Sequence, residues 1–278
     1  MEHALSDTWR MLSQRPNWEQ APRGLDRLWH HAVGLTGKIS RSPSRFLRYA
    51  DQVMAMEKRF NHIADRTLHH QMAPLQQRFR LGRDTAEDCL TAIAMVREVT
   101  ARAIGLRPYR EQVAGALALN AGCITEMATG EGKTLVAVMP AVLAGWRGRG
   151  CHVITANDYL ARRDAELTSS IYRQCSLTVG CVSHDMEPTE RRRAYNADIT
   201  YCTNKEVAAD FLRDRLSIGH HQGLPSVLLS RICAEGLEKT RRLAQRGLAC
   251  AIIDEADSVF IDDAVTPLLI SGEAPNQE

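Results

Sequence analysis

The sequence predicts an α/β protein in which helices cover a parallel sheet, preceded by an all-helical segment. From residue 122 onward, short apolar runs alternate with segments of helical periodicity, which is typical of strand–helix–strand units. Residues 46–106 carry apolar side chains at helical spacing and no strand-like run. With 44% apolar and 24% charged residues, the 278-residue chain has the composition of a globular protein with a buried core.

The first segment, residues 1–45, is poorly patterned and basic. Proline and glycine recur through it and interrupt any long helix. Residues 1–110 contain 18 Lys and Arg against 11 Asp and Glu, whereas the rest of the chain contains 17 against 22. A basic front suits an anionic membrane surface or a nucleic acid, and a solvated helical face explains it equally well.

Helices are expected across residues 46–106. The last of them should end at Gly105. It carries Asp84, Glu87 and Asp88 near its start, where the helix dipole favours negative charge. Beyond it, strands are expected in GCITEMA, CHVITA, LTVGCVS, DITYCT and ACAIIDEAD, with helices between them. Residues 218–247 break this alternation and indicate an inserted loop and helix.

The stretch MATGEGKT, at residues 127–134, indicates a phosphate-binding loop between a strand and a helix, with Met127 where the usual pattern has glycine. Glycines let backbone N–H groups surround phosphate oxygens, and a helix N-terminus favours negative charge. Lys133 is expected to bridge the β- and γ-phosphates, and Thr134 to hold Mg²⁺ through its hydroxyl. The expected nucleotide contacts of the loop are Gly130, Glu131, Gly132, Lys133 and Thr134.

Two further motifs complete the expected site. The apolar run AII leads into Asp254 and Glu255, and carboxylates at the carboxyl end of a strand suit metal binding by Asp254 and activation of water by Glu255. Ahead of the loop, the amide of Gln112 is placed to recognise the adenine edge, and Tyr109 to stack or pack beside the base. A helix-capping role for Gln112 is the competing interpretation.

Cysteine usage and the N-terminus bear on location. The eight cysteines show no CxxC pairing, which favours free thiols in a reducing compartment. The paired histidines lack partners at metal-ligand spacing. The N-terminus lacks the charged-then-apolar layout of a signal, and no apolar run approaches about 18 residues. We therefore expect a cytoplasmic protein in which any membrane contact is peripheral and lies at the inner face of the cell membrane.

Five segments resemble SecA, the bacterial preprotein translocase ATPase, and together they extend along roughly residues 45–272. They are VREVTARAIGLRPYREQ, ITEMATGEGKT, VITANDYLARRDAE, ADITYCTNKEVAADFLRD and IIDEADSVFIDDAVTPLLISG. SecA also has methionine where most phosphate loops have glycine. The resemblance implies a RecA-like P-loop NTPase fold, ATP and Mg²⁺ as cofactors, ATP contacts at Gln112 and residues 130–134, and catalytic roles for Lys133 and Glu255.

The resemblance also implies partners. They are a preprotein substrate and a membrane protein-conducting channel; anionic lipids are a further expected partner, no nucleic acid is expected, and a homodimer is left open. Four positions depart from the family pattern, which usually has a basic residue at Ala128, arginine at Val265, and an aromatic residue followed by glycine at Val207 and Ala208. These departures place the chain among divergent SecA-like proteins.

Domain boundaries follow from the same resemblance. Residues 107–272 should form the first nucleotide-binding motor domain, and residues 273–278 the start of a linker to a preprotein-binding domain. A second motor domain, outside this sequence, would supply the arginines that stabilise the transferring phosphate. This chain alone is therefore expected to bind nucleotide weakly and to turn over little of it.

Two other functions stay open. A DEAD-box nucleic-acid helicase would explain the letters DEAD at residues 254–257. Such helicases carry a PTREL-like segment after the second strand, where this chain has ANDYLARRD, and the difference favours the translocase. A non-catalytic nucleotide-binding module is the third interpretation, although Lys133, Thr134, Asp254 and Glu255 are all present.

Overall fold

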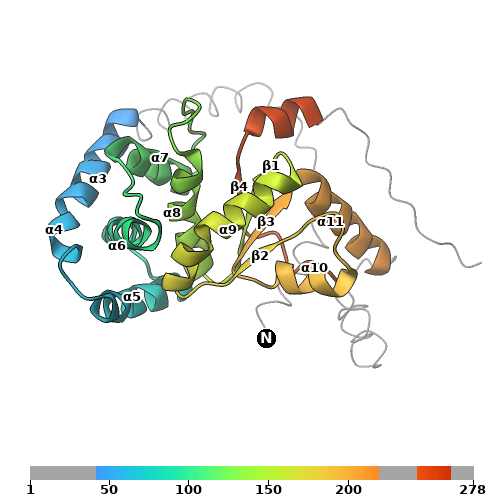
Figure 1. Ribbon diagram of the computed structural model, residues 1–278, viewed down its shortest axis with the longest axis horizontal. Coiled ribbons are helices and arrows are strands. Elements are labelled where there is room, and N and C mark those ends of the chain that lie inside the picture. Colours follow the sequence, from blue (N-terminus) through green and yellow to red (C-terminus); the bar gives the residue numbers. More distant parts are fainter. Residues whose placement is uncertain (1–41, 219–242, 264–278) are drawn as a thin grey trace, which may run out of the picture. The chain divides into compact units, whose positions relative to one another are not determined.

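The computed structural model describes residues 42–218 and 243–263 (Figure 1). The basic segment up to residue 41, most of the predicted insertion at 218–247, and the chain from residue 264 onward, which includes Val265 and the predicted linker, lie outside the described residues. The described chain divides into two compact units. The helical unit comprises residues 42–149 and 166–178, and the sheet unit comprises residues 150–165, 179–218 and 243–263.

Six helices build the helical unit: α3 (Pro43–Ala55), α4 (Glu57–Phe60), α5 (Asp65–Arg80), α6 (Ala86–Ile104), α7 (Arg110–Asn120) and α8 (Lys133–Trp146). Helix α6 contacts α3, α4, α5 and α8, so it forms the centre of this unit, and α7 packs on α3 and α8. Every residue of α8 from Leu135 to Trp146 is buried. No helix among the described residues is both long and apolar enough to cross a membrane.

The ends of α6 confirm the sequence expectation. Thr85 caps the helix by accepting a hydrogen bond from the backbone N–H of Asp88, whose carboxylate in turn accepts from the N–H of Thr85. This reciprocal capping box satisfies two N–H groups that lack partners within the helix. At the other end Gly105 adopts φ 74°, the left-handed conformation that glycine tolerates best, and the helix stops there.

The sheet unit contains four parallel strands in the order β2-β3-β1-β4. They are β1 (Cys151–Thr155), β2 (Val179–Cys181), β3 (Ile199–Thr203) and β4 (Ala251–Ile253), and with them belong α10 (Pro188–Tyr195), α11 (Asn204–Ile218) and the short π-helix η1 (Ser258–Asp262). Helix α9 (Asp158–Gln174) contributes residues 158–165 to this unit and residues 166–174 to the helical unit. The predicted α/β class with a parallel sheet is thereby confirmed.

Strands β1 and β3 are buried at every position, as central strands of a parallel sheet should be. Their register pairs Cys151 with Ile199 and Thr155 with Thr203, while β4 joins β1 through the pair His152 and Ala251. Apolar side chains from β1, β3, α10 and the turn after β2 pack together as a core: Ile154, Val182, Ala194, Tyr195 and Cys202.

One predicted strand is wrong. The segment GCITEMA before the phosphate loop carries no strand: residues 123–128 are irregular, and Ile124 is 94% exposed. A strand needs a neighbour that satisfies its backbone N–H and C=O groups, and none of the four described strands pairs with this segment. The helix expected after the loop is present as α8, and α7, the loop and α8 all belong to the helical unit.

Candidate functional site

The phosphate loop forms a tight turn that leads into α8. Gly130 and Gly132 adopt φ 87° and 80°, conformations that side chains with a Cβ rarely take, and Gly132 is the residue before the first turn of α8. Glu131 folds back inside the turn, where its carboxylate accepts a hydrogen bond from the backbone N–H of Ala128 at 3.1 Å. The two glycines therefore serve the turn that the sequence predicted.

Gln112 connects the start of α7 to this loop. Its Nε2 donates to the backbone oxygen of Glu131 at 2.6 Å, and its Oε1 accepts from the backbone N–H of Tyr109 at 2.8 Å. The side chain approaches so closely that a Cβ on Gly132 would lie 2.5 Å from Gln112 Nε2. Gln112 is 8% exposed, and both ends of its amide are used inside the protein. The capping interpretation of Gln112 is therefore observed.

Tyr109, Lys133 and Thr134 lie around this turn with different exposure. Tyr109 is 73% exposed and available for stacking. Lys133 is exposed, and Thr134 is half-buried, so the ammonium group and the hydroxyl both lie at the first turn of α8. The first N–H groups of any helix have no carbonyl partner within it, and they attract anions. The loop thus combines turn geometry, N–H donors and a cation as a phosphate site requires.

The acidic motif lies in the sheet unit. Asp254 directly follows β4, and its backbone N–H donates to the oxygen of Ile154 at 2.8 Å, which extends the ladder between β4 and β1. Its carboxylate accepts from the backbone N–H of Glu255 at 3.0 Å. Glu255 adopts φ 57°, an uncommon conformation for a residue with a side chain, and its carboxylate is exposed. The chain therefore turns sharply between these two acidic residues.

Other polar and charged side chains of the sheet unit pair among themselves near the ends of its helices. Asp263, after η1, accepts from the amide of Asn204 at 3.2 Å and pairs with Lys205 at 3.1 Å. These two hydrogen bonds hold the pKa of Asp263 below its ordinary value. The hydrogen bond to Asp164 raises the pKa of Arg163, and the negative charge of Asp254 adds to this effect.

Residue-level reasoning from sequence missed Asn204, Lys205 and Arg163. The signal available was their place in the SecA-like segments VITANDYLARRDAE and ADITYCTNKEVAADFLRD, in each of which they follow a strand.

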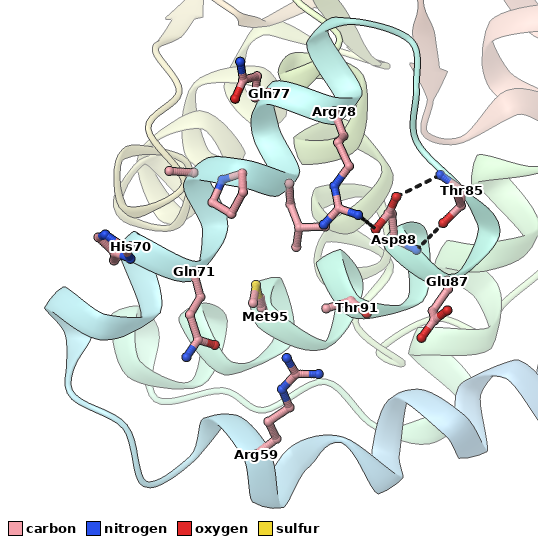
Figure 2. A pocket seen from close by; sticks show the side chains of 13 residues that line it. Arg59, His70, Gln71, Gln77, Arg78, Thr85, Glu87, Asp88, Thr91 and Met95 are labelled. Carbon is pink, nitrogen blue, oxygen red and sulfur yellow. Dashed lines mark hydrogen bonds and ion pairs between the residues drawn. The ribbon is translucent and has the colours of Figure 1, made fainter.

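A hollow of about 950 Å³ lies elsewhere in the helical unit, among α4, α5 and α6 (Figure 2). Arg78 and Asp88 form an ion pair of 2.8 Å in its lining, and Arg59, His70 and Glu87 add charged or polar groups. None of the predicted site residues lines this hollow.

The two side chains expected to hold Mg²⁺ lie in different units, Thr134 in the helical unit and Asp254 in the sheet unit. Within the described residues, no three His, Cys, Asp or Glu side chains gather as metal ligands. Mg²⁺ commonly takes one or two carboxylates and keeps water and nucleotide phosphates for its remaining positions.

Comparison with known proteins then identifies the family. The chain matches the SecA DEAD-like domain over residues 34–278. It belongs to the SecA DEAD-like domain family.

Relatives within SecA share about 40% of aligned residues with this chain. It is 42% identical over 232 residues to protein translocase subunit SecA 1 of Corynebacterium glutamicum, which covers 84% of this chain and 25% of that protein. It is 40% identical over 252 residues to protein translocase subunit SecA 2 of Magnetococcus marinus, with 90% and 39% covered. The SecA 2 of Chlorobium chlorochromatii is 40% identical over 266 residues, with 93% and 39% covered. The chain thus spans between a quarter and two fifths of these SecA proteins.

Proposed function

We propose that this chain is the ATP-binding motor portion of a SecA-type translocase, which couples ATP hydrolysis to the movement of preproteins across a membrane. The observation that carries the proposal is the phosphate loop. Gly130 and Gly132 hold conformations that allow backbone N–H groups to face a phosphate, and Lys133 stands exposed at the helix start. Membership of the SecA family supplies the translocase context, because the matched relatives are named protein translocase subunits.

The loop residues receive distinct roles in this proposal. Backbone N–H groups of residues 130–134 bind the phosphate oxygens, and the ammonium group of Lys133 neutralises charge on the β- and γ-phosphates during transfer. Thr134 and Asp254 are the proposed ligands of Mg²⁺, which when bound draws negative charge from the phosphate oxygens. Glu255 is the proposed general base, and its exposed carboxylate is free of the turn hydrogen bond that Asp254 makes.

The adenine side is assigned to Tyr109 and Gln112. Tyr109 offers an exposed ring on which a base can stack. Gln112 can present its amide to adenine only by exchanging the partners that it now holds, Tyr109 N–H and the oxygen of Glu131. Recognition of adenine by this residue would therefore alter the loop that binds the phosphates.

The wider activity is proposed from the matched relatives, of which this chain spans 25% to 39%. We propose a preprotein substrate, a membrane channel and anionic lipids as partners, and a cytoplasmic protein bound peripherally at the membrane. Full turnover is proposed to need arginines of a second motor domain, because such arginines stabilise the charge on the transferring phosphate.

Titration of the 278-residue chain with a fluorescent ATP analogue and Mg²⁺ tests the proposal. Lys133→Ala should weaken binding about tenfold or more, because it removes a charge-assisted contact to phosphate. Lys58→Ala is the matched control, since Lys58 is an exposed lysine on α4. Equal affinity of Lys133→Ala and Lys58→Ala would refute the phosphate role. Stimulation of ATP hydrolysis by RNA in the native protein, with none by preprotein, would favour the helicase function instead.

A further inference from the structure

Six charged side chains form a cluster at the carboxyl-terminal half of α6, here called the α6 ion cluster. Arg97, Glu98 and Arg102 come from α6, Glu57 and Asp65 from α4 and α5, and Arg107 from the loop after α6. The ion pairs Arg97–Glu57, Arg102–Glu98, Arg102–Asp65 and Arg107–Glu98 measure 2.8, 2.8, 2.7 and 2.7 Å. The cluster contains three positive and three negative groups, so its charges balance.

Two members of the α6 ion cluster are almost completely buried. The side chains of Arg97 and Glu98 are only 6% and 5% exposed. Removing such groups from water costs free energy that ion pairing offsets only when every donor is well placed, so a buried cluster is weak evidence for stability. The hydrogen bond from Arg97 also holds the pKa of Glu57 below its ordinary value, which keeps that partner charged. The role of the cluster therefore lies in the parts of the fold that it holds in place.

The two central arginines of α6 hold different parts of the helical unit. Arg97 donates through Nε to the backbone oxygen of Pro108 at 2.7 Å, which lies in the loop between α6 and α7. Arg102 donates to the backbone oxygen of Phe60 at 2.7 Å, at the end of α4. Each arginine thus joins one carbonyl and at least one carboxylate, but only Arg97 contacts the loop that enters α7.

That loop leads directly to the proposed nucleotide site. Pro108 is followed by Tyr109, whose N–H is bonded to Gln112 Oε1, and Gln112 Nε2 is bonded to the oxygen of Glu131. Three hydrogen bonds of 2.7, 2.8 and 2.6 Å therefore link Arg97 to the phosphate loop. The first and second bonds share the peptide unit between Pro108 and Tyr109, and the second and third share the side-chain amide of Gln112. Gly132 lies against the last of these groups.

We propose that Arg97 is a positioning residue for the nucleotide site. It holds the carbonyl of Pro108, this fixes the first residues of α7, and Gln112 is thereby presented to the phosphate loop in one orientation. Glu57 and Glu98 support this role, Glu57 by pairing with Arg97 and Glu98 by holding Arg107 on the same loop. The inference rests on the proposed nucleotide function, and Arg97 itself touches no nucleotide.

Arg97→Lys, compared with Arg102→Lys, tests this role in the 278-residue chain. Lysine keeps the charge but cannot reproduce the fork of guanidinium donors, so Arg97→Lys cannot serve Glu57 and Pro108 together. Two readouts are needed: hydrogen exchange without nucleotide, over residues 106–116 and 128–136, and the affinity for a fluorescent ADP analogue. We expect Arg97→Lys to speed exchange in both peptides and to weaken binding about tenfold, the scale of a lost supporting contact. Arg102→Lys should change neither the hydrogen exchange of these peptides nor the affinity, even if it lowers the melting temperature as much as Arg97→Lys does.

The outcomes separate the positioning role from the nucleotide function. Suppose that the unaltered chain binds the analogue. If Arg97→Lys and Arg102→Lys then change hydrogen exchange and affinity to the same extent, or if neither variant changes them, the positioning role is wrong. If the unaltered chain binds no nucleotide and Arg97→Lys still speeds exchange in both peptides, the proposed function fails and the structural link from Arg97 to the loop stands. Should Arg97→Lys not fold, Glu57→Gln gives the second test, because Glu57 is 33% exposed and glutamine keeps its size. Unchanged exchange and affinity in Glu57→Gln would then overturn the proposal.

Discussion

His152 on β1 is buried without a hydrogen-bond partner on either ring nitrogen, and its burial predicts that acid destabilises the sheet unit. The ring lies 5.9 Å from that of Tyr195. Burial lowers the pKa of His152 to about 4, from the ordinary value of 6.5, and the positive charge of Arg246 adds to the effect. Between these two pKa values, the imidazole of His152 binds a proton in the unfolded chain but stays neutral in the folded chain.

The sign and size follow from proton linkage. The folded pKa lies below the unfolded pKa, so between about pH 6.5 and pH 4 the unfolded chain binds more protons and stability falls as pH falls. One pKa unit corresponds to about 1.4 kcal/mol, so the whole shift is worth about 3 kcal/mol. At pH 5 most of this loss, about 2 kcal/mol, has already occurred. Above pH 7 the contribution is constant.

Urea denaturation at pH 7 and pH 5, followed by circular dichroism, measures this effect. His152→Leu should remove about 2 kcal/mol of the pH dependence, and it should cost little at pH 7 because it deletes two buried nitrogens that lack partners. His69→Leu is the control, since His69 is exposed on α5. Parallel pH curves for the unaltered chain and His152→Leu, or an equal effect from His69→Leu, would refute the reasoning.

Three further predictions concern packing, chemistry and the basic segment. Gly180→Ala should lower the free energy of unfolding by about 1–3 kcal/mol, because its Cβ would meet the backbone of Ala194 on α10; an unchanged denaturation midpoint would contradict this. Glu255→Gln should keep ATP binding but slow single-turnover hydrolysis in the native protein by about 10²-fold or more; equal rates would place the general base elsewhere. Deleting residues 1–45 should reduce co-sedimentation with anionic liposomes, and added salt should have the same effect, since each basic residue near such a surface contributes about 1 kcal/mol; binding that survives both changes would exclude the membrane role.

The sequence was informative where a local signal and its tertiary setting agree. Helix α6 carries its own capping box and a terminal glycine, and β1 and β3 are short, mainly apolar runs that are buried at every position, so their type was predictable. The turn at Gly130 and Gly132 followed from the glycines alone. The segment GCITEMA failed because an apolar run specifies a strand only where another strand pairs with it.

The supporting contacts of the site were beyond sequence reasoning. Arg97 and Pro108 are 11 residues apart and Gln112 and Glu131 are 19 apart, so only the folded chain shows that they meet. The double use of the Gln112 amide was equally hidden, because a capping residue and a base-reading residue look the same in a sequence. Arg97 and Arg102 lie on one helix and reach different backbone oxygens, those of Pro108 and Phe60, which only the folded chain shows.

The central claim is that the phosphate loop binds ATP, and backbone amide chemical shifts of the ¹⁵N-labelled chain test it most directly. Addition of ATP with Mg²⁺ should shift the amide signals of Gly130, Gly132 and Lys133, because their N–H groups would bond to phosphate oxygens. Lys58 and other exposed positions on α4 should stay in place. Unmoved signals throughout residues 130–134 at saturating ATP, or shifts confined to the hollow among α4, α5 and α6, would contradict the claim.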